Sequence, residues 1–142
     1  MNVKITSEGI RYIALFESLT GAAVRDCIVD EENDRVIFVV KKGDMGIAIG
    51  KNGSNINRVK KSIGNHTEIV EYSDDACEFI ENTFQPAMIK KVDIVSKESK
   101  RLAYVSVVPK DKGLAIGRDG RNIQKAKILA KRHHGLDDVI IE

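Results

Sequence analysis

Aromatic residues are scarce in this chain, which contains no tryptophan, four phenylalanines and three tyrosines among 142 residues. The scarcity argues against nucleic-acid readers that stack bases on an aromatic platform. Long hydrophobic runs are absent as well, and none approaches the length of a membrane span. The start of the sequence, Met1 to Lys4, does not have the character of a signal peptide. We therefore expect a cytoplasmic protein with no membrane partner.

Cysteine is limited to Cys27 and Cys77, and the three histidines do not cluster with them in the sequence. A metal site requires clustered ligands, so we expect no metal and no cofactor. The sequence suggests no set of serine, histidine and aspartate, or of cysteine and histidine. The acid pair Asp137-Asp138 falls in a predicted turn. We therefore expect that the protein is not an enzyme.

Net charge is only +2, so neither sign dominates the composition. The basic residues are nevertheless concentrated in two segments. Residues 50–61 contain four basic side chains and no acid, and residues 117–134 contain six basic side chains and one acid. A solvated helix face is the simpler interpretation of either segment alone. Both segments follow the same short motif, however, which favours a contact with phosphate.

That motif is a repeat that organises the whole chain. The segment from Asp44 to Ile56, DMGIAIGKNGSNI, recurs 67 residues later as DKGLAIGRDGRNI, from Asp111 to Ile123, with eight of 13 positions identical. A gapless repeat of this length predicts two similar domains. We place the first domain at residues 1–72 and the second at residues 73–142.

Hydrophobic spacing and turn residues predict the same order of elements in both halves. In the first half they indicate a helix at 6–19 with Ser7 as its N-cap, strands at 22–30 and 36–40, a short helix before residue 50, a helix ended by Gly64, and a strand at 67–70. In the second half they indicate a helix stopped by Pro86, strands at 92–95 and 102–108, a helix starting at Pro109, a helix from 121 to about 131 closed by His133-His134, and a strand at 139–141. Each half is thus predicted to be α-β-β-α-α-β, an α+β fold. The apolar segment 36–40 is expected to be covered on at least part of both faces.

Each repeat contains the pattern Gly-x-x-Gly between two predicted helices, as Gly50-Lys51-Asn52-Gly53 and Gly117-Arg118-Asp119-Gly120. A nucleotide-binding P-loop is excluded, because Met45 stands where its first glycine would be and Asn52 replaces the hydroxyl that holds magnesium. An isolated pair of glycines would most simply form a tight turn. Here both copies carry a basic residue, and a Cβ on either glycine would hold the loop away from the backbone of a ligand.

This arrangement resembles the KH domain, whose GxxG loop joins two helices and clamps the sugar-phosphate backbone of single-stranded nucleic acid. The order of elements is similar to the type II KH fold. The resemblance implies two tandem type II KH domains, each with a three-stranded sheet packed by helices. Over its whole length the sequence resembles the archaeal NusA-like transcription factors, most specifically in the loops GIAIGKNG and GLAIGRDG.

The resemblance implies a single-stranded RNA-binding protein that acts on nascent transcripts in transcription termination or antitermination, with RNA polymerase as a further candidate partner. The alternatives are a ribosome-associated or rRNA-processing KH protein and a KH-derived protein-interaction module. The expected RNA contacts are the loops, the aliphatic residues beside them and the basic residues that follow: Ile49, Gly50, Lys51, Asn52, Gly53, Ile56, Lys60 and Lys61, and in the second half Ile116, Gly117, Arg118, Asp119, Gly120, Arg121, Ile123 and Lys125. The carboxylate of Asp119 should weaken phosphate contact in the second loop.

Overall fold

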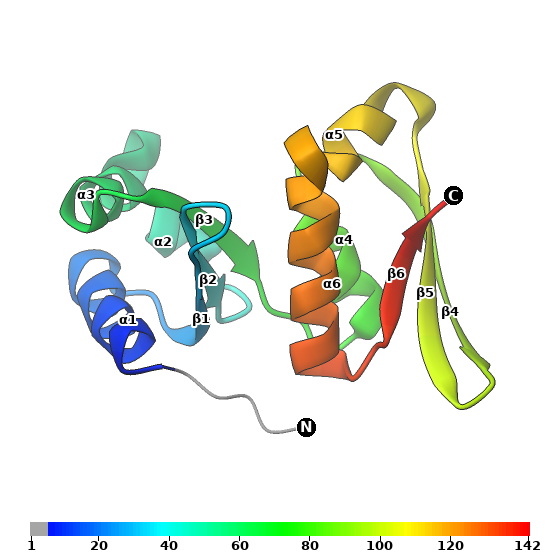
Figure 1. Cartoon of the computed structure of the whole chain (residues 1–142). Coiled ribbons are helices and arrows are strands. Elements are labelled where there is room, and N and C mark those ends of the chain that lie inside the picture. The colour runs from blue at the N-terminus through cyan, green and yellow to red at the C-terminus, as the bar shows by residue number, and fades with distance from the viewer. Residues whose placement is uncertain (1–5) are drawn as a thin grey trace. The chain divides into compact units, whose positions relative to one another are not determined.

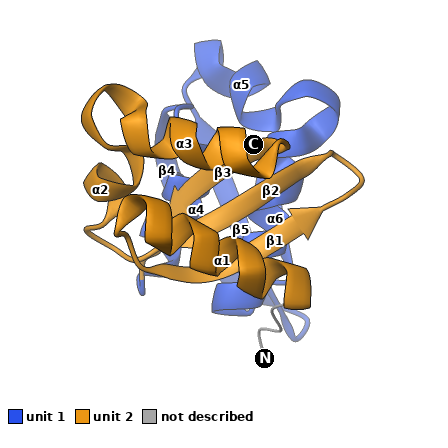
Figure 2. Cartoon of the chain, turned by 90° about the vertical axis from the view of Figure 1, so that its left-hand side faces the viewer, with its two compact units in different colours: residues 1–3, 74–142 blue, residues 4–73 orange. Residues whose placement is uncertain are grey.

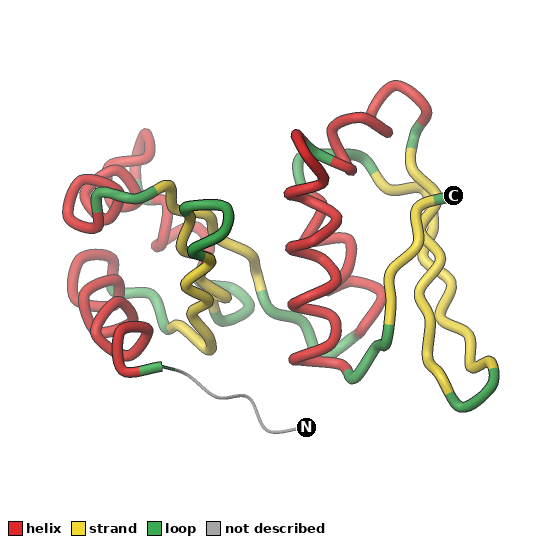
Figure 3. The backbone as a smooth tube through the Cα atoms, viewed as in Figure 1, coloured by secondary structure: helices red, strands yellow, loops and turns green. Residues whose placement is uncertain are grey.

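The computed structural model describes residues 6–142, which form two compact units, residues 6–73 and residues 74–142 (Figure 1; Figure 2). Each unit contains a three-stranded sheet and follows the order helix, strand, strand, helix, helix, strand (Figure 3). The α+β fold and the order of elements predicted from the sequence are therefore confirmed.

The first unit is built around the central strand of its sheet. Its elements are α1 (Ser7–Thr20), β1 (Val24–Asp30), β2 (Arg35–Val40), α2 (Met45–Ile49), α3 (Ser54–Ile63) and β3 (His66–Glu71). Strand β2 pairs with β1 in antiparallel and with β3 in parallel orientation. Helices α1 and α3 lie across one face of this sheet (Figure 2). Every residue of β2 is buried, which confirms that this strand is covered on both faces.

Helix α1 supplies much of the core of the first unit. Its Phe16 is fully buried and lies against Phe38 of β2, with the ring centroids 4.4 Å apart. The N-cap of this helix is Thr6, one residue before the predicted Ser7. The Thr6 hydroxyl accepts a hydrogen bond from the Gly9 amide at 3.0 Å. Gly21 ends the helix in the left-handed conformation.

The second unit repeats this topology. Its elements are α4 (Ala76–Phe84), β4 (Ile89–Lys97), β5 (Lys100–Val107), α5 (Lys112–Ile116), α6 (Arg121–His134) and β6 (Asp138–Ile141). Strand β5 is central, antiparallel to β4 and parallel to β6. Helices α4 and α6 cover one face of the sheet (Figure 1), and Phe84, Val105 and Ala130 are among the buried residues of the core between them.

Two predicted boundaries in the second unit differ from the structure. Strand β4 is nine residues long, whereas only residues 92–95 were expected, because its outer face carries charged side chains that hide the strand in the hydropathy pattern. Pro109 opens a 3₁₀ turn, η2 (Pro109–Asp111), and helix α5 starts three residues later. The predicted closure of α6 by His133-His134 is confirmed. Among residues 6–142, no helix is long and apolar enough to cross a membrane.

Candidate nucleic-acid interface

The two GxxG loops have nearly the same backbone conformation. Gly50 has φ 75° and ψ 173°, and Gly117 has φ 78° and ψ 168°. The third residue of each loop is left-handed, with φ 56° at Asn52 and 57° at Asp119. Asn and Asp tolerate this region better than most other residues with a side chain. The second glycines, Gly53 and Gly120, both have φ 77°. The loops are thus two copies of one structure that leads from α2 into α3 and from α5 into α6.

The first and second glycines of each loop are needed for different reasons. A Cβ on Gly50 would lie 2.9 Å from the backbone nitrogen of Asn55, and one on Gly117 would lie 2.8 Å from that of Asn122. A Cβ on Gly53 would come no closer than 3.5 Å to any heavy atom beyond its chain neighbours. The first glycine is therefore required by the packing of the loop itself. A Cβ on the second glycine would make only ordinary van der Waals contacts, so packing does not require glycine there, and the expected effect of a Cβ on ligand approach applies to this position.

A side-chain amide fastens each loop from within. The Nδ2 atom of Asn55 donates to the carbonyl oxygen of Ile47 at 2.8 Å, and that of Asn122 donates to the carbonyl oxygen of Leu114 at 2.7 Å. Each bond ties the first turn of the second helix back to the short helix before the loop. These asparagines were not among the predicted site residues. Their identity in both repeats was the signal that could have identified them.

A carboxylate anchors the other end of the motif. Asp44 Oδ2 accepts from the Ala23 amide at 2.8 Å, and Asp111 Oδ2 accepts from the Met88 amide at 2.9 Å. These bonds hold the start of the short helix against the chain that enters the first strand of each unit. The motif is therefore attached to the rest of its unit at one end and locked around its loop at the other.

The four predicted aliphatic contacts divide into two pairs. Ile49 and Ile116 precede the first glycine and are each 40% exposed, so they are available to a ligand beside the loop. Ile56 is only 9% exposed and belongs to the core of the first unit. Ile123 is partly buried against the core of the second unit. The second pair therefore contributes mainly to packing beneath the loops.

Positive charge continues from the first loop along α3. Lys51 and Asn52 are exposed at the loop, and Lys60 and Lys61 are exposed farther along the helix. The two lysines line an open hollow together with Asn57 and Arg58. The Arg58 guanidinium also donates to Asn55 Oδ1. Arg58 was not among the predicted contacts, although it lies in the basic segment that the sequence showed.

In the second unit the structure brings only part of the predicted basic set to the surface. Arg118 and Asp119 are exposed at the loop, and Arg121 is partly buried at the start of α6. Lys125 is only 6% exposed, so it is not placed to attract a ligand from solution. Lys127 is exposed and lies 3.3 Å from Asp138.

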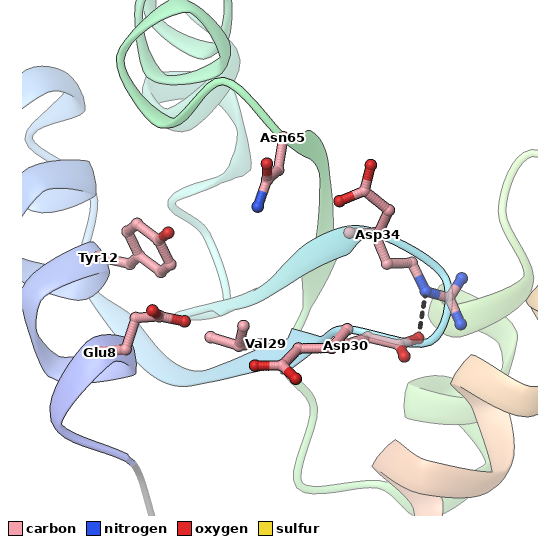
Figure 4. A pocket seen from close by; sticks show the side chains of 8 residues that line it. Glu8, Tyr12, Val29, Asp30, Asp34 and Asn65 are labelled. Atoms are coloured by element: carbon pink, nitrogen blue, oxygen red, sulfur yellow. Dashed lines mark hydrogen bonds and ion pairs between the residues drawn. The ribbon is translucent and has the colours of Figure 1, made fainter.

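The first unit also has an acidic hollow of about 220 Å³, away from its loop. Glu8 and Tyr12 of α1, Asp30 of β1 and Asn65 line it, together with neighbouring residues (Figure 4). Arg35 has a fully buried side chain, with Nε 2.8 Å from Asp30 Oδ2. The excess of carboxylates at this hollow disfavours phosphate.

Burial, hydrogen bonds and the charge of Arg35 together determine the pKa of Asp30. Burial alone would raise the pKa of this carboxyl group, but hydrogen bonds from Asn33 and Arg35, with the charge of Arg35, outweigh it. The pKa therefore lies below the ordinary 3.8. Arg35 Nη1 also lies 3.3 Å from Glu68 Oε2, so one buried cation serves carboxylates from two strands.

The structure gives no support to metal or thiol chemistry. Within residues 6–142, no three histidine, cysteine, aspartate or glutamate side chains come together in a way that could hold a metal ion. Cys27 is buried. Burial raises the pKa of the Cys77 thiol, and the nearby carboxylates of Asp75, Glu81 and Asp93 raise it further. Cys77 is therefore protonated at neutral pH and is a poor nucleophile.

Sequence comparisons identify the class of both units. Residues 10–74 match the KH domain family, and residues 76–134 match the family described as the NusA-like second KH domain. The chain is therefore a tandem of KH domains, as its loops and topology indicate.

Proteins that match nearly the whole chain identify a narrower family within the KH proteins. A protein of Halococcus morrhuae named probable transcription termination protein NusA is 40% identical over 139 residues, which cover 98% of both chains. A protein of the same name from Methanocaldococcus jannaschii is 36% identical, over 92% of this chain and 70% of its own. The crystal structure of a protein designated APE1850 superposes with a TM-score of 0.85 at 37% identity, covering 97% of this chain and all of that one. The chain belongs to the archaeal NusA-like family.

Proposed function

We propose that this protein binds single-stranded RNA through both GxxG loops and acts in transcription termination or antitermination. The observation that carries the proposal is the duplicated loop, in which an exposed cation follows the first glycine and a second glycine stands where a Cβ would meet no clash. The names of the archaeal relatives place those proteins in transcription termination. Binding, and not catalysis, is the activity that this geometry supports.

The contacts follow from the chemistry of each loop position. Because Gly53 and Gly120 carry no side chain, the sugar-phosphate backbone can approach the peptide backbone closely there. Lys51 and Arg118 supply positive charge beside it. No side chain caps the first turn of α3 or of α6, so amide groups there can donate to phosphate oxygens. Ile49 and Ile116 offer apolar contacts to the bases.

The test is to replace the second glycine of both loops by aspartate and to measure the affinity for single-stranded RNA by fluorescence anisotropy. We expect Gly53→Asp with Gly120→Asp to abolish measurable binding, because each change puts a side chain and a negative charge where phosphate would lie. Aspartate tolerates the left-handed backbone, and the built Cβ meets no obstacle, so circular dichroism should show an unchanged fold.

Gly64→Asp is the matched control for the first loop. Gly64 also has a positive φ, 82°, and open space around its Cβ position, but it lies at the opposite end of α3, about 15 Å away along the helix. We expect this variant to bind within about threefold of the wild type, the size of a single remote surface charge. RNA affinity of the double loop variant close to that of Gly64→Asp would contradict the proposed role of the loops.

The cellular role requires a different measurement. Crosslinking the protein to RNA in cells, followed by sequencing, should recover nascent transcripts. Mature or precursor ribosomal RNA would instead support a ribosome-associated or rRNA-processing role. Recovery of protein partners without RNA would support a KH-derived interaction module. RNA polymerase is proposed as a partner through the shared transcript, and its recovery after nuclease treatment would indicate a direct contact.

A further inference from the structure

The second unit has another concentration of positive charge, at the turn between β4 and β5. Residues 97–101 contain Lys97, Lys100 and Arg101 against the single acid Glu98, and all five residues are exposed. In the first unit the turn between β1 and β2 lies within residues 30–35, which contain four acids and one arginine. The charge at this end of the sheet is therefore reversed between the two units.

The basic turn is built at a cost in stability. Lys97 and Lys100 are directly opposite each other in the strand register, where like charges repel. The two residues between them, Glu98 and Ser99, have φ 52° and 69°, although a turn of this kind favours asparagine and glycine. The side chains of the turn are exposed, so the burial of apolar surface does not offset this charge repulsion and backbone strain. Strain and repulsion kept at a surface site suggest a use for that site.

Arg101 fastens the turn to the end of α6. Its Nη1 donates to the carbonyl oxygen of His134 at 2.7 Å, and its amide donates to Asp137 Oδ2 at 2.8 Å. Lys131, which is exposed, lies one helical turn before His134. The hairpin turn and the last turn of α6 thus share one end of the unit, and α5, which leads into the GxxG loop, lies at the other (Figure 1).

The separation between the two ends follows from the helix that connects them. Helix α6 begins immediately after the GxxG loop and contains 14 residues, so it spans about 21 Å. A KH loop holds about four nucleotides. With about 3.4 Å for each stacked nucleotide, a strand that leaves the loop needs roughly six more to reach the far end.

We propose that the end formed by Lys97, Lys100, Arg101 and Lys131 is a second contact for the phosphate backbone of the RNA strand held by the loop of the second unit. This inference rests on the proposed function. The ligand is a phosphodiester chain of any sequence, because the side chains offer charge and N–H donors without a pocket for a base. The contact exists only for RNA long enough to reach from the loop to the hairpin.

The test compares two RNA lengths with a charge-reversal variant, Lys97→Glu with Lys100→Glu, in the full chain. The variant keeps a like-charged pair across the hairpin, so its stability should stay near that of the wild type. For an RNA of about 12 nucleotides we expect an affinity loss of roughly fivefold or more, and a salt slope smaller by roughly 0.7 for each phosphate that the variant no longer neutralises. For an RNA of about five nucleotides, titrated by NMR, we expect a change of less than about twofold.

A control with the same total charge change is Arg11→Glu with Lys90→Glu, at two exposed positions outside the proposed end. The control should leave both RNA affinities near the wild-type values. Equal reductions of affinity in the control and the hairpin variant would overturn the inference, because they would show a general charge effect. So would unchanged binding of the long RNA by the hairpin variant, or equal reductions for the long and the short RNA. If the wild type binds neither RNA, the proposed function itself fails, and this inference fails with it.

Discussion

The two units make the same contacts around their GxxG loops, but have different side chains at the hairpin between their first two strands. Around the GxxG loops, the same glycines, asparagine and aspartate make the same contacts in both. At the hairpin end, the first unit has the ion-paired Asp30, Arg35 and Glu68 on its outer sheet face. The register places apolar side chains at the corresponding positions of the second unit, namely Val95, Leu102 and Ile140.

This difference shows which part of the repeat is under geometric constraint. The loop connects two helices within four residues, and few residue types fit its backbone angles. The outer sheet face makes no such demand on the backbone angles, so a buried ion pair can occupy it in the first unit and apolar side chains in the second. Shared chemistry is therefore found where the backbone is unusual, and individual chemistry where the backbone is regular.

The largest expected effect concerns the shared end. Gly50→Ala and Gly117→Ala should each lower the free energy of unfolding by about 2–3 kcal/mol, because the new Cβ meets backbone and the residue must hold a conformation that only glycine adopts readily. Gly53→Ala and Gly120→Ala should cost only about 1 kcal/mol each, the penalty for left-handed backbone without a clash. Urea denaturation of the four variants measures the difference. Equal destabilisation at the first and second glycines would show that internal packing does not distinguish them.

The next prediction concerns the ion pair of Asp30 with Arg35 in the first unit, where the second unit has apolar residues in register. Asp30 has a lowered pKa in the folded protein, so its contribution to stability is complete above the ordinary value of 3.8 and is lost as the pH falls through the lower folded value. The stability difference between wild type and Asp30→Asn should therefore shrink as the pH falls from about 5 to well below 3.8. Urea denaturation at several pH values measures this.

Glu31→Gln, at the exposed neighbouring position, is the control for that titration and should show a much smaller dependence on pH. The second unit has Val95 where the first has Asp30. Protonation of Asp30 in acid should therefore reduce amide-exchange protection in residues 6–73, and the second unit has no carboxylate at this position. A difference between wild type and Asp30→Asn that stays constant with pH would rule out the ion pair as its source.

The smallest expected effect concerns the one charge that separates the two loops. Asp119→Asn should raise RNA affinity about threefold at low salt, because it removes one exposed carboxylate beside the phosphate backbone. The reverse change, Asn52→Asp, should lower affinity by a similar factor. Both residues adopt the same left-handed backbone, so neither change should alter stability. If the gain from Asp119→Asn persists undiminished in high salt, it does not come from electrostatics.

Much of this architecture could be predicted because its determinants are local. The repeat revealed two similar units, and helical spacing, with Gly64 after one helix and His133-His134 at the end of the other, located α3 and α6 to within a few residues. The sequence alone could not fix the first residue of α1, because Thr6 and Ser7 are both good N-caps. Only the hydrogen bond from the Gly9 amide decides between them. In β4, charged residues on the outer face concealed more than half of the strand.

The composition of the site was harder to predict because it depends on packing. A basic residue in a helix is exposed or buried according to the face it occupies, and Lys125 occupies a buried one. The hydrogen-bond partners of Asn55 and Asp44 lie 8 and 21 residues away in the sequence, so no local sequence pattern predicts these bonds. Identity between the repeats marked these residues as constrained, but only the structure shows what constrains them.

The collision that a side chain would cause at Gly50 and Gly117 has a consequence for tracing how such domains change over evolutionary time. A descendant that no longer needed RNA could accept other residues at Gly53 and Gly120 at modest cost, whereas any other residue at the first glycine would still lower its stability more strongly. Loss of the second glycine alone would then mark a domain that has kept its fold but no longer binds RNA. Loss of the first would indicate that the turn itself had been rebuilt.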